Sequence, residues 1–179
     1  MLKWKLQYGS ALERYQMLVL HGPSRTGKSR LARSLFGEME TLVVDVQHAV
    51  HPDLHGFDRK KHKAILLDEV SSPQFIVQNK KLLQAHVDGA ILGQSATQLY
   101  TYEVFLWRIP IMLTTNVWDY ASYAEPDKNW IESNCVAVHI AQPVWHSGDT
   151  PPSSPRAAAA LPLREGTDMS DVSPARSEF

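Results

Sequence analysis

The segment Met17–Leu35 reads MLVLHGPSRTGKSRLARSL, and it predicts a strand, a tight turn and a helix in that order. Its first residues, Met17–His21, form a short aliphatic run typical of a buried strand. The next eight residues fit the pattern G-x-x-x-x-G-K-[ST], whose backbone N–H groups surround a phosphate. Gly22 and Gly27 permit the backbone angles that such a turn needs. We therefore expect a phosphate-binding loop between a strand and a helix.

Lys28 and Ser29 close this loop and carry its chemistry. The lysine ammonium would reach the β- and γ-phosphates of a nucleoside triphosphate, and the serine hydroxyl would bind Mg²⁺. The residues expected to bind the nucleotide are Gly22, Pro23, Ser24, Arg25, Thr26, Gly27, Lys28 and Ser29.

Polar side chains end two further apolar runs. The run AILLDEV carries Asp68 and Glu69, and the run IPIMLTTN ends in Asn116. Asp68 would hold Mg²⁺, and Glu69 would accept the proton of an attacking water or orient that water. Asn116 would hydrogen-bond the terminal phosphate and the water. The expected catalytic residues are Lys28, Glu69 and Asn116, and the expected metal ligands are Ser29 and Asp68.

Short apolar runs alternate with amphipathic segments along the chain. Beyond Met17–His21, strands are predicted at Thr41–Val46, Ala64–Leu67, Ile109–Thr114 and Cys135–Ile140. Helices are predicted at Lys28–Phe36 and Phe75–His86, and a strand or hairpin within residues 90–107. Strands separated by helices predict an α/β fold whose central parallel sheet is covered on both faces.

The three motifs GPSRTGKS, AILLDEV and IPIMLTTN resemble those of the superfamily-3 helicase domain found in replication-initiator (Rep) proteins. Such proteins belong to circular single-stranded DNA viruses and their integrated cellular relatives. The resemblance covers residues 17–145. It implies a compact AAA+-like, three-layer P-loop NTPase that hydrolyses ATP with Mg²⁺, between the subunits of a homo-oligomeric ring. By position, Lys28 and Ser29 match the first motif, Asp68 and Glu69 the second, and Asn116 the third.

The resemblance also implies a helix and a hairpin that grip single-stranded nucleic acid, DNA rather than RNA. The matching candidates here are Lys80 and Lys81 on a predicted helix, and Tyr100 and Tyr102 in the strand-like segment, with Trp107 nearby. Aromatic rings can stack on bases. Core packing of the aromatics and a solvated face for the lysines remain the alternatives.

One expected feature of the family is missing from the sequence. Rep helicases usually place an arginine before their last core strand, where it reaches the neighbouring subunit's ATP, yet no arginine lies between Arg108 and Arg156. Hydrolysis would then need Arg108, Lys128 or a partner protein. A degenerate nucleotide-binding or oligomerisation module is the main alternative. A small-molecule kinase is disfavoured, because residues 117–146 lack the arginines of a kinase lid.

Composition divides the 179 residues into three parts. Residues 1–16 are expected to form a lead-in helix or arm, residues 17–146 the P-loop domain, and the Pro/Ser/Ala-rich residues 147–179 a disordered tail. The endonuclease domain of viral Rep proteins is expected to be absent, because only sixteen residues precede the first strand. The single cysteine and the lack of a signal peptide or membrane span predict a cytoplasmic or nuclear protein without a membrane partner.

Overall fold

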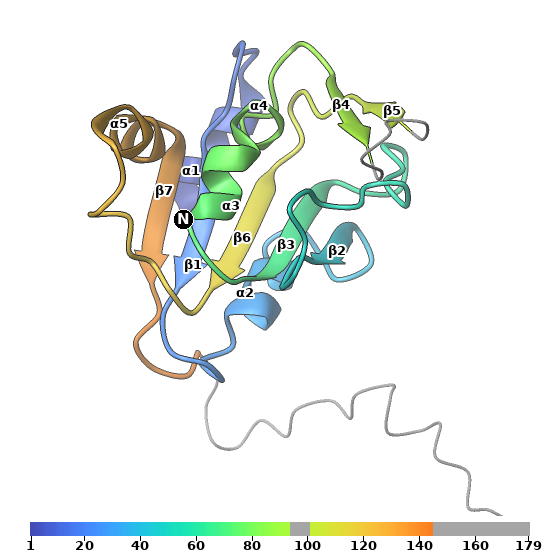
Figure 1. Ribbon diagram of the computed structural model, residues 1–179. Coiled ribbons are helices and arrows are strands. Elements are labelled where there is room, and N and C mark those ends of the chain that lie inside the picture. Colours follow the sequence, from blue (N-terminus) through green and yellow to red (C-terminus); the bar gives the residue numbers. More distant parts are fainter. Residues whose placement is uncertain (94–100, 145–179) are drawn as a thin grey trace, which may run out of the picture. The chain divides into compact units, whose positions relative to one another are not determined.

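A five-stranded parallel sheet forms the centre of the protein, in the strand order β2-β3-β6-β1-β7 (Figure 1). The computed structural model describes residues 1–93 and 101–144. Tyr100 and the tail at 147–179 therefore lie outside the described residues. The strands of the sheet are β1 (Met17–His21), β2 (Thr41–Asp45), β3 (Ala64–Val70), β6 (Ile111–Thr115) and β7 (Cys135–His139).

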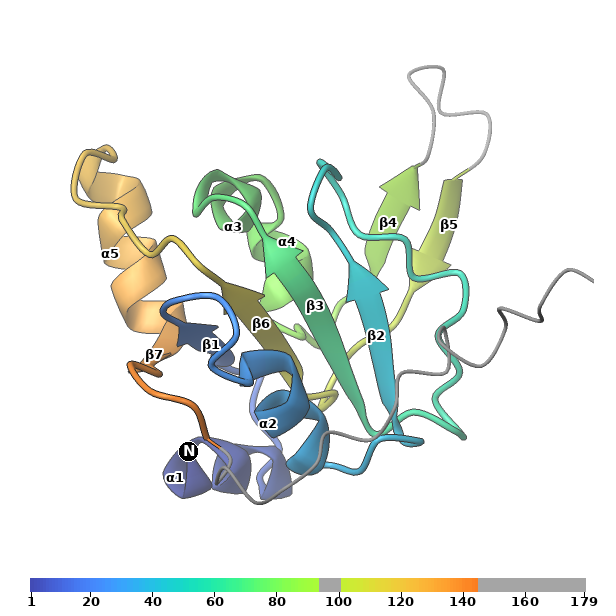
Figure 2. The same ribbon diagram turned by 90° about the horizontal axis from the view of Figure 1, so that it is seen from below.

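Helices cover both faces of the sheet, as the sequence predicts (Figure 2). The helices are α1 (Leu2–Leu6, followed by a 3-10 turn at Gln7–Gly9), α2 (Lys28–Ser34), α3 (Gln74–Gln78), α4 (Lys80–Leu83) and α5 (Glu125–Asn134). Alternate residues of β1 serve the two faces: Leu18 and Leu20 pack with α1 and α2, whereas Met17 and Val19 belong to the core under α3, α4 and α5. The α/β fold with a central parallel sheet is therefore confirmed.

The prediction of one continuous helix over Phe75–His86 is wrong. Two short helices, α3 and α4, replace it, and they meet at Asn79. The Asn79 side chain is buried, and its Nδ2 donates to the backbone oxygens of Val50, at 2.8 Å, and Phe75, at 2.7 Å. An asparagine that bonds its surroundings in this way competes with regular helix geometry.

An antiparallel pair of strands, β4 (Ala90–Gly93) and β5 (Thr101–Val104), lies outside the main sheet. It precedes β6 in the chain, where the sequence predicts a strand or hairpin. Leu92 and Val104 are buried in the same core cluster as the residues of α3 and α4. The pair is thus anchored beside the sheet, at the upper right of Figure 1.

Gly22 is required by its surroundings as well as by its conformation. Its φ is 140°, and a Cβ built on it would lie 2.3 Å from the carbonyl oxygen of Ile140. We expect Gly22→Ala to lower the free energy of unfolding by about 2–4 kcal/mol, because backbone strain and a backbone clash add together. Chemical denaturation measures this loss. The matched control is Gly9→Ala, because no heavy atom lies within 4 Å of a Cβ at Gly9; an equal loss in both variants would contradict the account.

A search for membrane-spanning helices is negative over residues 1–93 and 101–144: none of their helices has the length and apolar character to cross a bilayer.

Candidate phosphate-binding site

The turn between β1 and α2 lies at the carboxyl end of the parallel strands, the lower edge of the sheet in Figure 1. Three of its residues have positive φ: Gly22 at 140°, Arg25 at 63° and Gly27 at 85°. Gly27 precedes the first helical residue, and its carbonyl accepts the N–H of Leu31 at 2.9 Å. The loop is therefore folded back on itself before α2 begins. Parallel α/β sheets commonly bind ligands at this edge.

Lys28 is held inside this loop by three neutral oxygens. Its Nζ donates to the carbonyls of Gly22, at 3.0 Å, and Pro23, at 2.7 Å, and to Oδ1 of Asn116, at 2.9 Å. The residue is only 7% exposed, and burial lowers the pKa of its ammonium, against the attraction of Asp68. Among the ion pairs of the described residues, none involves Lys28. A buried cation without a paired carboxylate favours an anionic ligand.

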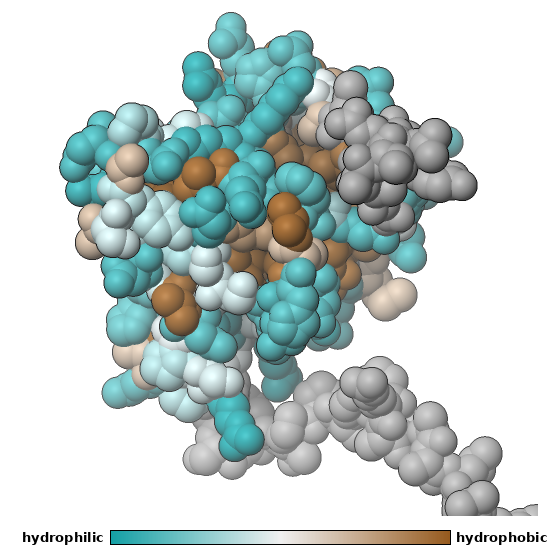
Figure 3. Space-filling view, in the orientation of Figure 1, coloured by the Kyte–Doolittle hydropathy of each residue, from teal (hydrophilic) through white to brown (hydrophobic). Residues whose placement is uncertain are grey.

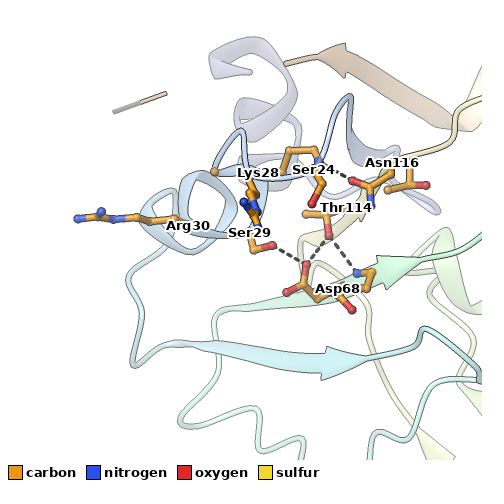
Figure 4. Close-up of a pocket in the computed structure, with 11 residues that line it drawn as sticks. Ser24, Lys28, Ser29, Arg30, Asp68, Thr114 and Asn116 are labelled. Carbon is orange, nitrogen blue, oxygen red and sulfur yellow. Dashed lines mark hydrogen bonds between the residues drawn. The ribbon is translucent and has the colours of Figure 1, made fainter. Parts of the chain in front are cut away.

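Asp68 joins two hydroxyl groups at the end of β3 (Figure 4). Its Oδ1 accepts the hydroxyl of Ser29 at 2.7 Å and also the hydroxyl of Thr114. The Thr114 oxygen in turn accepts the backbone N–H of Glu69 at 3.2 Å. Three elements, α2, β3 and β6, thus meet at one carboxylate oxygen.

The donors at this point suit Mg²⁺, a hard cation that prefers oxygen ligands. Mg²⁺ in nucleotide sites is commonly held by one or two protein oxygens together with substrate phosphates. The Ser29 hydroxyl and the Asp68 carboxylate provide two such oxygens, and both residues line the cavity that Lys28 also lines. The residues therefore fit the metal.

Glu69 lies at an irregularity of β3. The pairing of β3 with β6 shifts register between Leu67 and Val70, and Glu69 has a φ of 61°. A non-glycine residue with such an angle is uncommon and often found at functional positions. The side chain is exposed and lines two neighbouring cavities, of about 230 and 250 Å³. Its carboxylate is therefore accessible to water beside Asp68.

The first of these cavities collects most of the site residues expected from the sequence. It is lined by Ser24, Arg25, Gly27, Lys28, Ser29, Arg30, Asp68, Glu69, Thr114, Thr115 and Asn116. Gly22 and Pro23 take part through their carbonyls, and Thr26 is buried, with its hydroxyl donating to Pro23 O at 3.0 Å. In Figure 4 the Arg30 side chain points away from Asp68.

Thr114 was not singled out as a site residue by the sequence, although it contacts both members of the Asp-Glu pair. The available signal was a hydroxyl residue at the end of a buried strand, two positions before the asparagine. That signal is weak, because threonine is common in strands. Only the pairing of β6 between β1 and β3 places it beside Asp68.

The candidates for nucleic-acid contact make contacts within the chain. Lys80 forms an ion pair with Asp127 at 2.5 Å and lies over the ring of Trp130. The Tyr102 oxygen accepts the backbone N–H of Leu54 at 2.7 Å, and its ring lies 3.8 Å from that of His55, centroid to centroid. These contacts join α4 to α5 and β5 to the loop after β2.

Lys81 is the exposed one of the two candidate lysines, and it lines a small cavity of about 120 Å³ next to His51 and Asn79. Tyr100 lies outside the described residues. Trp107 is half-buried, and its Nε1 donates to the carbonyl of Leu12 at 2.8 Å.

The two cations suggested as substitutes for the missing arginine lie outside the lining of the cavity. Arg108 precedes β6 and donates to the carbonyls of Tyr8, at 3.2 Å, and Gly9, at 3.4 Å. Lys128 lies on α5 and pairs with Glu125 at 2.8 Å. Arg25, which belongs to the loop between β1 and α2, lines the cavity within the same chain.

A scan against models of known protein families finds no match for this chain, and a search of the curated proteins finds none either.

Proposed function

We propose that the protein binds ATP with Mg²⁺ and hydrolyses its terminal phosphate. The observation that carries this proposal is the buried ammonium of Lys28, unpaired with any carboxylate of the described residues, in the same cavity as the Ser29–Asp68 pair. A polyphosphate would supply the anionic oxygens that Lys28 lacks, and Ser29 and Asp68 would hold the Mg²⁺ that accompanies it. ATP is the nucleotide that the resemblance implies.

Each side chain of the site then has a separate role in binding or hydrolysis. Lys28 exchanges its contacts with Asn116 and the loop carbonyls for phosphate oxygens, while Ser29 and Asp68 hold Mg²⁺. Mg²⁺ held there would supply positive charge against the negative charge that develops on the phosphate oxygens. Glu69 accepts the proton of the attacking water, and the released Asn116 amide orients that water or bonds the terminal phosphate. The contact between Lys28 and Asn116 couples the loop to the end of β6.

We propose further that hydrolysis drives a helicase or translocase on single-stranded nucleic acid, DNA rather than RNA, in a homo-oligomeric ring. The resemblance of the three motifs supports this, and so does the β4–β5 pair between the second and third motifs. In such a ring, a neighbouring protomer or a partner protein would supply the cation that faces the terminal phosphate.

The second candidate is a module that binds the nucleotide without turning it over. One observation favours it: Arg108 is bonded to the Tyr8 and Gly9 carbonyls, and no arginine follows it before Arg156. The two candidates share the binding site and differ in the rate of hydrolysis.

The experiment that separates them measures ATPase activity of the whole chain with Mg²⁺, with and without single-stranded DNA or RNA. It is run over a range of protein concentrations, with the mass of the assembly measured in parallel. Turnover that rises with a single strand and with assembly supports the motor. Saturable ATP binding without turnover at any concentration selects the module.

The lowered pKa of Lys28 gives a pH-dependent prediction. In the free protein, part of the Lys28 ammonium loses its proton below pH 10.5, the ordinary value for lysine, and a bound anion restores it. ATP phosphates stay ionised above neutral pH. ATP affinity should therefore fall as pH rises through the lowered pKa of Lys28. Above that pKa the fall approaches about tenfold for each pH unit. Lys28→Arg keeps its charge and should show no such fall; equal profiles for both proteins would contradict this.

A further inference from the structure

A group of cationic and aromatic residues lies at the end of the sheet opposite the phosphate-binding loop. The residues are Arg59, Lys60, Lys61, Phe105, Trp107 and Arg108, and we call them the amino-end surface. The first three precede β3 and the others precede β6, so they lie at the amino ends of two neighbouring parallel strands. The seven-residue β3 separates them from Asp68 and Glu69 by roughly 15–20 Å.

The cations of this surface lack a carboxylate partner among residues 1–93 and 101–144. No ion pair of the described residues includes Arg59, Lys60, Lys61 or Arg108. The nearby Lys63, in contrast, pairs with Glu40, as Lys80 does with Asp127. The protein as a whole carries a net charge of −1, so this local concentration of positive charge stands out against its surroundings.

Both arginines lie over aromatic rings. The Arg59 guanidinium carbon is 5.3 Å from the centroid of Phe105, and Arg59 Nη2 donates to the carbonyl of Trp107 at 3.0 Å. The Arg108 guanidinium carbon is 5.7 Å from the ring of Trp107. Arginine has five N–H donors, so each guanidinium keeps donors for a ligand while its orientation is fixed. Phe105 is 47% exposed, which leaves part of its ring open to solvent.

Single exposed apolar side chains are common on protein surfaces, and Phe105 is one of several among the described residues. On the side seen in Figure 3, hydrophobic side chains appear in small separate areas within a mainly hydrophilic surface. Phe105 differs from the other large exposed apolar side chains of the described residues in being aromatic and in having an arginine over its ring, which favours a ligand that uses a ring and cations together. Single-stranded nucleic acid is such a ligand, because phosphates pair with cations and bases stack on rings.

We propose that the amino-end surface binds single-stranded nucleic acid, with phosphates on Arg59, Lys60 and Lys61 and a base against Phe105. The proposal depends on the proposed motor function in one respect: it makes the bound nucleic-acid strand the substrate on which the ATPase acts. It replaces Lys80 and Tyr102, whose side chains are engaged within the chain, as the main contacts. Because the surface lies at the opposite end of the sheet from the ATP site, one protomer binds the nucleic acid and ATP at the same time.

The test is fluorescence anisotropy of a labelled oligothymidylate of about 20 nucleotides, bound to the whole chain at several salt concentrations. Arg59→Ala should weaken binding about tenfold and lower the salt dependence, the slope of log K against log salt, by about 0.7. Phe105→Ala should weaken binding about fivefold to a hundredfold, without changing that slope. Lys3→Ala removes the same charge from α1, where the exposed Lys3 forms no ion pair among the described residues, and as a matched control it should leave affinity and slope unchanged.

Two parallel measurements keep the outcomes apart. A labelled ATP analogue should bind all variants equally, which also shows that they are folded. Equal weakening by Arg59→Ala and Lys3→Ala would overturn the surface assignment, and so would equally tight binding of polyglutamate. A wild-type protein that binds ATP but no oligonucleotide would refute this surface and the motor on single strands, and would leave the proposed ATP site standing. One that binds the oligonucleotide through Arg59 and Phe105 but no ATP would refute the proposed function and leave the surface standing.

Discussion

Replacing Lys28 with alanine is expected to weaken ATP binding at least about a hundredfold. The ammonium is the buried cation of the cavity, and each hydrogen bond to a charged group contributes about 1.5–3 kcal/mol. Removing two such bonds to phosphate oxygens gives a loss of this size or more. The change also deprives the Gly22 and Pro23 carbonyls and the Asn116 amide oxygen of their common donor. Titration with a fluorescent ATP analogue in the presence of Mg²⁺ measures the affinity.

The control for Lys28→Ala is Lys3→Ala, which removes an exposed lysine of α1. The control should bind the analogue as tightly as wild type, and circular dichroism should show both variants folded. A folded Lys28→Ala protein with wild-type affinity would mean that the nucleotide does not enter the loop, and the assignment of the whole site would fall.

Glu69→Gln should lower the rate of ATP hydrolysis by about 10²–10⁴-fold while leaving ATP affinity within a few-fold of wild type. The amide has the size of the carboxylate, but it cannot accept the proton of the attacking water, and general-base catalysis contributes about this factor. Glu69 is exposed and lies beside Asp68 without a direct contact to Lys28, so binding should survive. Single-turnover hydrolysis of labelled ATP separates the chemical step from binding.

Glu132→Gln is the matched control for this change, because it neutralises an exposed glutamate on α5. It should hydrolyse ATP at the wild-type rate. Full activity in Glu69→Gln would contradict the role of Glu69 as general base. Another group would then activate the water, and Glu69 would only contribute to the backbone irregularity of β3.

The strands were predictable because each is a short, nearly continuous apolar run, and the central strands β1 and β6 are buried along almost their whole length. Met17–His21 was predicted with both ends correct, and Thr41–Asp45 and Cys135–His139 within one residue. The helix α5 carries no comparable signal: Ile131 is its one buried residue, and much of its surface is polar. The break at Asn79 depends on the carbonyl of Val50, a residue distant in sequence, so no local pattern could show it.

The turn between β1 and α2 could be predicted because the constraint on its backbone is local. The backbone angles of this turn are determined by its own residues, from Gly22 to Gly27. Lys28 is the next residue in the chain and begins α2. The contact between Lys28 and Asn116 was less accessible, since it depends on β6 pairing beside β1. A motif places Asn116 at a strand end, but only sheet order decides which loop that end faces.

Surface residues were the hardest to interpret from sequence. Lys80 and Tyr102 had the right types for nucleic-acid contact, yet Asp127 and the Leu54 backbone engage them. A charged side chain is available to a ligand only when no neighbouring side chain neutralises it. Neighbours that come from other helices or strands cannot be identified from the local sequence. The same reasoning explains why Arg59 and Phe105 become informative only when seen together.

The central claim, that the cavity around Lys28, Ser29 and Asp68 binds a Mg²⁺–nucleoside triphosphate, is tested most directly by equilibrium dialysis. A labelled, non-hydrolysable ATP analogue is dialysed against the folded chain with Mg²⁺ and with a chelator, for wild type and for Asp68→Asn. We expect saturable binding of one nucleotide per chain, tightened by Mg²⁺ in wild type and much less in Asp68→Asn. Saturable binding that is equally tight with and without Mg²⁺ in both proteins, or no saturable binding to the folded wild type, would contradict it.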